Sequence, residues 1–169
     1  SNEENHEWPQ RTWNRAEKLM LIYIVRHGLT EWNKLKKLQG IADVPLAEEG
    51  ILLAEKTGEA LRGVKFDICF TSPLSRARQT AECVLGKRDV PIIPDKRIQE
   101  INFGVLEGDQ VRDAAGNYID PQIETFFRDP VNFKRPENGE DIFDVIARTK
   151  DFWDEKTSDP ALADKTILV

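Results

Sequence analysis

Residues Leu21–Asn33, with the sequence LIYIVRHGLTEWN, are the most informative segment of the chain. It begins with five apolar residues, partly β-branched, a pattern typical of one buried β-strand. Arg26, His27 and Gly28 follow at once. In an open parallel sheet, ligands collect outside the carboxyl ends of the strands, where loops and helix N-termini converge. The sequence therefore predicts a functional His27, beside a permanently charged guanidinium suited to phosphate or carboxylate oxygens.

Strands and helices are predicted to alternate along the rest of the chain. The strands are expected at residues 21–25, 66–71, 90–93 and 166–169. A helix is predicted over 46–61, where apolar and small residues recur at helical spacing: Leu46, Gly50, Leu53, Ala54, Thr57 and Leu61. Ser72 as N-cap, followed by Pro73, predicts a second helix ending at Gly86. A third should begin near Asp141, with an apolar stripe through Trp153. This order favours a three-layer α/β/α fold around a mostly parallel sheet.

Length and composition indicate one globular domain. The chain has 169 residues and a net charge of −6, which argues against nucleic acid and anionic membranes as partners. No segment is long and apolar enough to cross a membrane. Cys69 and Cys83 lack metal-ligand spacing and are expected to be free thiols, which points to the cytoplasm.

The domain boundaries follow from where the patterns begin. Residues 1–19 are polar without a clear period, and Met20 directly precedes the first strand. We interpret 1–19 as an extension or a cloning remnant and 20–169 as the domain. Residues 104–132, rich in Gly, Asp and Asn, are expected to form an insertion over one end of the sheet.

Several motifs carry a resemblance to a known family. They are Arg26-His27-Gly28 with Thr30, Trp32 and Asn33, then Gln39-Gly40, Asp43-Val44-Pro45-Leu46, SPLSRARQTA over Ser72–Ala81, EINFG over Glu100–Gly104 with Glu107-Gly108, and PENGE over Pro136–Glu140. In this order and spacing the chain resembles the histidine phosphatases, the superfamily that includes cofactor-dependent phosphoglycerate mutases. The resemblance covers the chain from Met20 to its end and implies a phosphoglycerate mutase-like fold.

A phosphohistidine mechanism is implied by this resemblance. His27 would become phosphorylated, Arg26 and Arg76 would bind the phosphate, and Glu100 would be the proton donor. The residues themselves agree, because nearby arginines disfavour the imidazolium and keep a nitrogen lone pair available. The positions that match substrate-binding residues of the family are Thr30, Asn33, Gln39 and Gly40. No metal-ligand cluster surrounds His27, so neither a metal nor another cofactor is expected.

Structural roles are the competing interpretation for single residues. A lone histidine after a strand is more often structural, but the placement of Arg26 and Arg76 reverses that expectation here. Arg78 is expected at the surface, and the run Lys34 to Lys37 is either a solvated face or a surface that steers anions. Glu107 could equally be structural and is left outside the catalytic set.

The end of the chain departs from the family pattern. The family normally has a second catalytic histidine, followed by glycine, after a final apolar strand. Thr166–Val169 matches that strand, and the sequence stops there; His6 is the only other histidine and precedes the matching region. We therefore expect a domain that lacks its C-terminal part, either as a piece of a longer enzyme or as a natural end that lowers the rate.

Hydrolysis of a small phosphomonoester is the predicted activity. Phosphoglycerate mutases resemble one another after the position of Gly108 through an insertion with extra Lys, Arg and Tyr. Here residues 109–132 are mostly acidic, amide or apolar, with Arg112 and Arg128 isolated. A mutase is the alternative within the class. A phosphate-binding domain with weak or no catalysis is the alternative outside it.

Overall fold

The computed structural model describes residues 19–169. Its strands are β1 (Leu21–Tyr23), β2 (Ile68–Thr71), β3 (Ile92–Pro94) and β4 (Thr166–Leu168). Its α-helices are α1 (Glu31–Lys34), α2 (Glu48–Ala60), α3 (Ser75–Leu85), α4 (Pro121–Arg128) and α5 (Ile142–Ser158). The predicted extension, residues 1–19, falls outside the described range except for its last residue. None of the helices within that range is long and apolar enough to cross a membrane.

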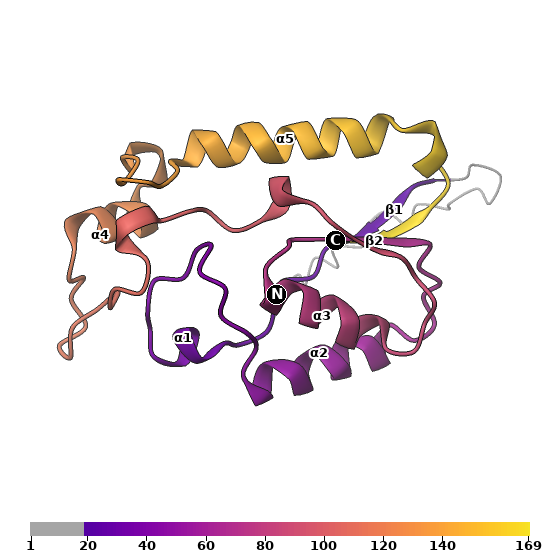
Figure 1. The fold of residues 1–169 in the computed structure, drawn as a ribbon, viewed down its shortest axis with the longest axis horizontal. Coiled ribbons are helices and arrows are strands. Elements are labelled where there is room, and N and C mark those ends of the chain that lie inside the picture. Colours follow the sequence, from indigo (N-terminus) through magenta and orange to yellow (C-terminus); the bar gives the residue numbers. More distant parts are fainter. Residues whose placement is uncertain (1–18) are drawn as a thin grey trace, which may run out of the picture.

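The four strands form one parallel sheet in the order β1-β4-β2-β3. Side chains alternate across it: Cys69 and Leu168 pack toward α3, whereas Phe70 and Ile167 pack toward α5. Helices α2 and α3 therefore cover one face and α5 the other, as Figure 1 shows. This confirms the predicted three-layer arrangement. Most predicted boundaries differ from the observed ones by about one or two residues, as helix and strand ends usually do.

Small residues bring α2 against its neighbours. Its buried positions are Gly50, Ala54 and Gly58, whereas Leu53 is 57% exposed. A Cβ on Gly58 would lie 2.6 Å from the carbonyl oxygen of Val84 in α3. Of the residues predicted at helical spacing, Gly50 and Ala54 are buried, but Leu53 is turned outward because the helix approaches α3 closely at Gly58.

The start of α3 also differs from the prediction. Ser72 is not the N-cap: its hydroxyl accepts a hydrogen bond from the Leu74 backbone N–H at 3.3 Å, and the helix begins only at Ser75. The Ser75 N–H is instead bound by the Asp43 carboxylate at 2.7 Å. A distant loop thus supplies the cap that local sequence assigned to Ser72, since a serine hydroxyl can close a turn instead.

Helix α5 begins as predicted, with Asp141 as its N-cap in a capping box with Asp144. Phe152 on its inner face is fully buried, and its ring meets Phe70 of the sheet edge to face, with ring centroids 5.7 Å apart. Ile146, which belongs to the predicted apolar stripe, is 52% exposed. The C-terminal half of α5 therefore carries the contact with the sheet.

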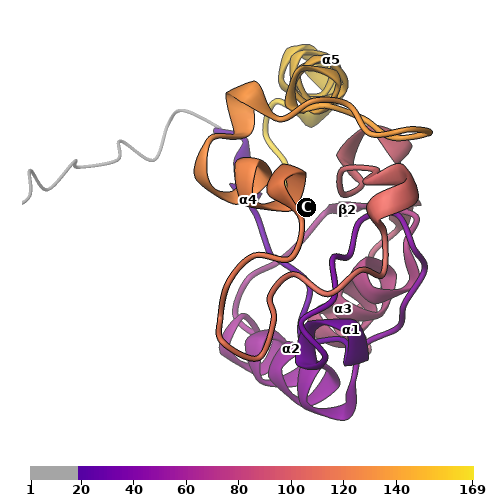
Figure 2. The same cartoon turned by 90° about the vertical axis from the view of Figure 1, so that its left-hand side faces the viewer.

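The predicted insertion shares a small core with the segments that flank it and with Leu38. Phe103, Leu106 and Ile123 pack there with Phe133, and α4 supplies part of the wall. This cluster lies beside the end of α5 where that helix begins, away from the strands (Figures 1 and 2). Residues 104–132 are thus a packed satellite of the sheet with well-defined contacts.

Candidate active site at the carboxyl end of the sheet

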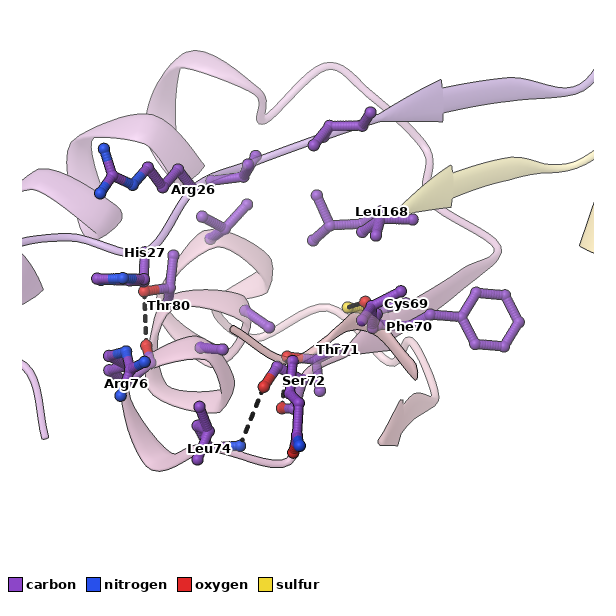
Figure 3. Close-up of a pocket in the computed structure, with 18 of the residues that line it drawn as sticks. Arg26, His27, Cys69, Phe70, Thr71, Ser72, Leu74, Arg76, Thr80 and Leu168 are labelled. Carbon is purple, nitrogen blue, oxygen red and sulfur yellow. Dashed lines mark hydrogen bonds between the residues drawn. The ribbon is translucent and has the colours of Figure 1, made fainter. Parts of the chain in front are cut away.

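The four predicted catalytic residues line one cavity. Its volume is about 270 Å³, and it opens where β1, β2 and β4 end. Arg26 and His27 follow β1, Arg76 lies in the first turn of α3, and Glu100 follows the 3-10 helix η1 (Lys96–Ile98). Figure 3 shows the His27 ring between Arg26 and Arg76. Because the strands are parallel, their carboxyl ends meet at this edge and bring residues far apart in sequence together.

The His27 ring is held in one tautomer. Its Nδ1 lies 2.7 Å from the carbonyl oxygen of Gly28, so Nδ1–H donates and Nε2 keeps its lone pair. Burial lowers the pKa of His27, and the charges of Arg76 and Arg26 lower it further, while the Gly28 carbonyl and Glu100 act in the opposite direction. The net shift favours the neutral imidazole, the form that can act as a nucleophile.

Arg76 is almost completely buried, with 1% of its surface exposed. Its Nη1 donates to the carbonyl of Ala42 at 2.9 Å and its Nη2 to that of Gly40 at 2.5 Å. Burial lowers the pKa of Arg76, which the carboxylates of Glu100 and Glu107 oppose. Since an arginine stays protonated in proteins, the cavity wall carries a fixed positive charge beside His27.

Glu107 fixes the loop at residues 40–42, whose carbonyl oxygens bind Arg76. Its two carboxylate oxygens accept the backbone N–H groups of Ile41 at 2.7 Å and Ala42 at 2.6 Å. A Cβ on Gly40 would lie 2.5 Å from the same carboxylate, so only glycine fits there. The structure thus gives Glu107 a structural role. Sequence reasoning could single it out by its motif, but not by this contact, because backbone groups leave no pattern in the sequence.

The predicted substrate-binding residues hydrogen-bond mainly to one another, outside the cavity. Thr30 is fully buried; its hydroxyl lies 2.6 Å from Oε1 of Gln39, and its backbone N–H donates to Asn33. The pair Thr30 and Asn33 forms a capping box at the start of α1. None of Thr30, Asn33, Gln39 and Gly40 lines the cavity, although Gly40 orients Arg76 through its carbonyl. Their role toward a substrate stays a prediction.

Charged residues near the site that were expected on the surface are found there. Arg78 pairs with Glu82 and is mostly exposed. Lys34 bonds Glu31 and Glu49, which neutralises its charge locally. For Lys34 these pairs favour the solvated-face interpretation over anion steering.

The pH dependence of His27 follows from its lowered pKa. We expect its ring to titrate below the ordinary value of 6.5. The unfolded chain then binds the proton at higher pH than the folded chain, so this group's stability contribution is complete above pH ~6.5 and is lost as pH falls through the folded pKa. NMR titration of a His6→Gln variant, which leaves a single imidazole, measures the folded value. A midpoint at or above 6.5 would contradict the burial and charge argument.

Comparison with known proteins identifies the family of the chain. The sequence profile of the histidine phosphatase superfamily (branch 1) matches residues 22–169, so the chain belongs to this superfamily. Among curated relatives, 2,3-bisphosphoglycerate-dependent phosphoglycerate mutase 2 of Gloeobacter violaceus is 33% identical, with 89% of this chain and 69% of the relative covered. The corresponding mutase of Methylobacterium sp. is 37% identical, with 76% of this chain and 63% of the relative covered.

Solved structures of the same superfamily have the same fold. The alpha-ribazole phosphatase from Shigella flexneri superposes with a TM-score of 0.75 at 28% identity, covering 87% of this chain and 71% of that one. YhfR of Bacillus stearothermophilus gives a TM-score of 0.72 at 32% identity, covering 88% and 72%. The phosphoglycerate mutase-like fold expected from the sequence is thereby confirmed.

Proposed function

We propose that the chain hydrolyses small phosphomonoesters through a phosphohistidine formed on His27. The observation that carries the proposal is the 2.7 Å contact between Nδ1 of His27 and the Gly28 carbonyl oxygen. A carbonyl only accepts, so Nδ1–H donates and Nε2 of the neutral ring keeps its lone pair, in a cavity that Arg76 and Glu100 also line. Nucleophile, cation and acid are the three groups that transfer of a phosphoryl group requires.

The proposed reaction has two steps. Nε2 of His27 attacks phosphorus, the bond from phosphorus to the ester oxygen breaks, and that oxygen takes a proton from Glu100. A water molecule then attacks the phosphohistidine, Glu100 takes its proton, and the bond from nitrogen to phosphorus breaks to give phosphate and neutral His27. Arg26 and Arg76 neutralise the phosphoryl oxygens in both steps.

Glu100 has one oxygen occupied and one available. Its Oε1 accepts the Ile101 backbone N–H at 2.9 Å, which fixes the direction of the carboxyl group. The second oxygen can then carry the proton to the leaving group. The side chain is exposed at the mouth of the cavity, where a substrate would enter.

A hydrolase fits the connector better than a mutase. Arg112 donates to the Gly116 carbonyl and lies 3.7 Å from the centroid of the Tyr118 ring, while Arg128 pairs with Glu124. Both cations of this segment are thus engaged away from the cavity. The specific observation in favour of a mutase is that the curated relatives bear that name.

Turnover of p-nitrophenyl phosphate, combined with trapping of the intermediate, tests the proposal. A short acid-free quench should give a chain carrying one phosphoryl group on His27, detected by intact mass and by its loss in acid. Conversion of 3-phosphoglycerate to 2-phosphoglycerate without net phosphate release would favour the mutase. Binding of inorganic phosphate with no turnover of any ester would favour the non-catalytic alternative and reject the hydrolase.

The compartment is proposed from the thiols. Cys69 and Cys83 are both free, and burial raises the pKa of Cys69 to about 11, which makes it an unreactive core residue. Two free thiols, of which Cys69 is buried and Cys83 partly buried, support the cytoplasm as the place where this chain acts.

A further inference from the structure

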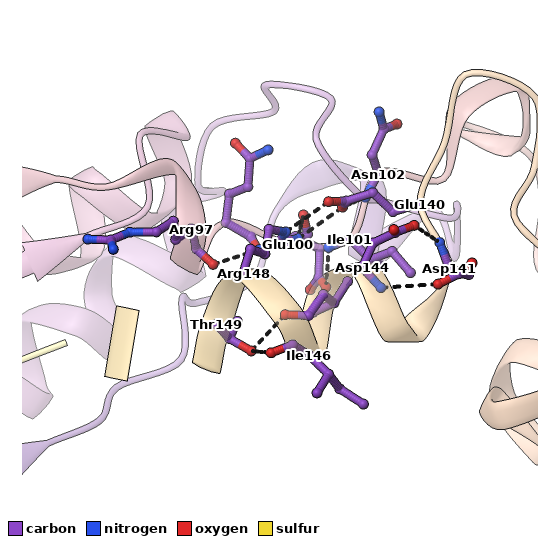
Figure 4. Close-up of polar contacts among 12 residues, drawn as sticks. Arg97, Glu100, Ile101, Asn102, Glu140, Asp141, Asp144, Ile146, Arg148 and Thr149 are labelled. Atoms are coloured by element: carbon purple, nitrogen blue, oxygen red, sulfur yellow. Dashed lines mark hydrogen bonds and ion pairs between the residues drawn. The ribbon is translucent and has the colours of Figure 1, made fainter. Parts of the chain in front are cut away.

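Arg148 on α5 donates every N–H of its guanidinium group to backbone carbonyls of residues 97–100 and to the carboxylate of Glu140. Its Nη1 donates to the carbonyls of Arg97 at 2.8 Å and Gln99 at 2.7 Å, and Nη2 donates to that of Glu100 at 3.0 Å. Its Nε and Nη2 also bind the two oxygens of Glu140, at 2.8 and 3.0 Å. Figure 4 shows these contacts around Arg148.

Glu140 binds both Arg148 and the backbone of Asn102. Its Oε2 accepts the backbone N–H of Asn102 at 2.9 Å, and its own N–H donates to the Asn102 carbonyl at 2.8 Å. Burial tends to raise the pKa of Glu140, but the bonds from Arg148 and Asn102 outweigh it and leave that pKa below its ordinary value. Both side chains are largely buried, at 16% and 21% exposed, so solvent screens this pair little.

The backbone carbonyls and N–H groups of residues 99–102 are held largely by these bonds. The segment follows η1 and belongs to no strand or helix, so no ladder holds it, although the Ile101 side chain is buried in the satellite core. Glu100 itself is exposed, and its carboxyl group is directed only by the neighbouring Ile101 N–H. The position of that carboxyl group therefore follows the position of the backbone, which Arg148 and Glu140 hold from both sides.

We propose that Arg148, together with Glu140, is a positioning residue that holds the Glu100 carboxyl group at the distance needed to protonate the leaving oxygen. The inference rests on the proposed hydrolase function and adds residues to the same site. Arginine is required because its planar group spans a carboxylate and three carbonyls at once, which the compact ammonium of lysine does not. Displacement of a reacting group by about 1 Å costs up to about 10²-fold in rate.

Substrates with different leaving groups test this role. The anion of p-nitrophenol departs readily, whereas phenol, with a pKa near that of tyrosine, about 10, needs the acid. The value of kcat/KM reports the steps through formation of phosphohistidine. We expect Arg148→Met to lower kcat/KM about tenfold more for phenyl phosphate than for p-nitrophenyl phosphate. Glu100→Gln should show the same direction, and Arg148→Lys should resemble Arg148→Met.

Two further variants keep the test decisive. Asp151→Asn is the matched control, because Asp151 lies one turn further along α5 and pairs with Arg97 without touching residues 99–102. It should leave the ratio of the two kcat/KM values unchanged. In Arg148→Met the buried carboxylate of Glu140 loses its partner. The double variant Glu140→Gln/Arg148→Met replaces that carboxylate as well, so it remains usable where Arg148→Met fails to fold.

Amide hydrogen exchange supplies a readout that needs no turnover. Exchange at Ile101 and Asn102 should speed up in Arg148→Met and in the double variant, but not in Asp151→Asn. Unchanged exchange, or faster exchange with an unchanged substrate ratio, would overturn the proposal. If the unmodified chain hydrolyses neither ester, the hydrolase proposal fails, while exchange still decides whether Arg148 holds the segment.

Discussion

His27→Ala is expected to lower kcat/KM for p-nitrophenyl phosphate by about 10⁴-fold or more, the scale seen when a hydrolase loses its nucleophile. The loss is this large because no other described residue lining the cavity offers an equivalent lone pair: Cys69 shares the cavity, but its raised pKa keeps the thiol protonated. Covalent incorporation of phosphate, measured by intact mass after a short reaction, should disappear in the same variant.

The stability of the fold should change little in His27→Ala. The ring is only half-buried, and its single hydrogen bond goes to the adjacent Gly28. Urea unfolding of both proteins checks this. Arg78→Met is the control for effects of substitution and purification that do not involve the site, since Arg78 is exposed and pairs with Glu82. Turnover by His27→Ala close to that of the unmodified chain would show that another group is the nucleophile.

Arg76→Met is expected to lower kcat/KM by about 10²- to 10³-fold, the usual cost of removing one group that stabilises the transition-state charge. It should also destabilise the fold, because the carbonyls of Gly40 and Ala42 lose their donors. Each buried polar group left unpaired costs about 1–3 kcal/mol. The denaturant midpoint should therefore fall. The affinity for inorganic phosphate should fall as well, because a cation of the proposed phosphate site is lost.

Arg76→Lys separates charge from geometry. It keeps the positive charge but cannot donate to two carbonyls in the fixed directions of a guanidinium. We expect a rate between those of Arg76→Met and the unmodified chain. The pKa of His27 should rise in Arg76→Met, because a charge that lowers it has been removed. Phosphate affinity that is unchanged in Arg76→Met would exclude Arg76 from the phosphate site.

Local patterns predicted the layers of the fold well. The apolar runs before His27 and over 166–169 form strands because β-branched, apolar residues favour a sheet. The predicted burial is found for β4, but it was wrong for β1, which lies at the edge of the sheet with Leu21 51% exposed. Asp141 caps α5 because its side chain and Asp144 satisfy the first backbone N–H groups locally. Ser72 was wrongly predicted to be the N-cap, and Leu53 is exposed although it shares the predicted helical spacing, because contacts with Asp43 and with α3, distant in sequence, determine their surroundings.

The α/β alternation, the family and the candidates His27, Arg26, Arg76 and Glu100 can be predicted without coordinates, since they depend on periodicity and on motifs read within short windows. How the candidates are held depends on contacts between segments that are distant in the chain. Glu107 positions Arg76 by binding the loop at residues 40–42, and Arg148 binds the backbone carbonyl of Glu100. Every residue has a carbonyl and nearly every residue an N–H, so such contacts are specified by chain packing and are invisible in the order of side chains.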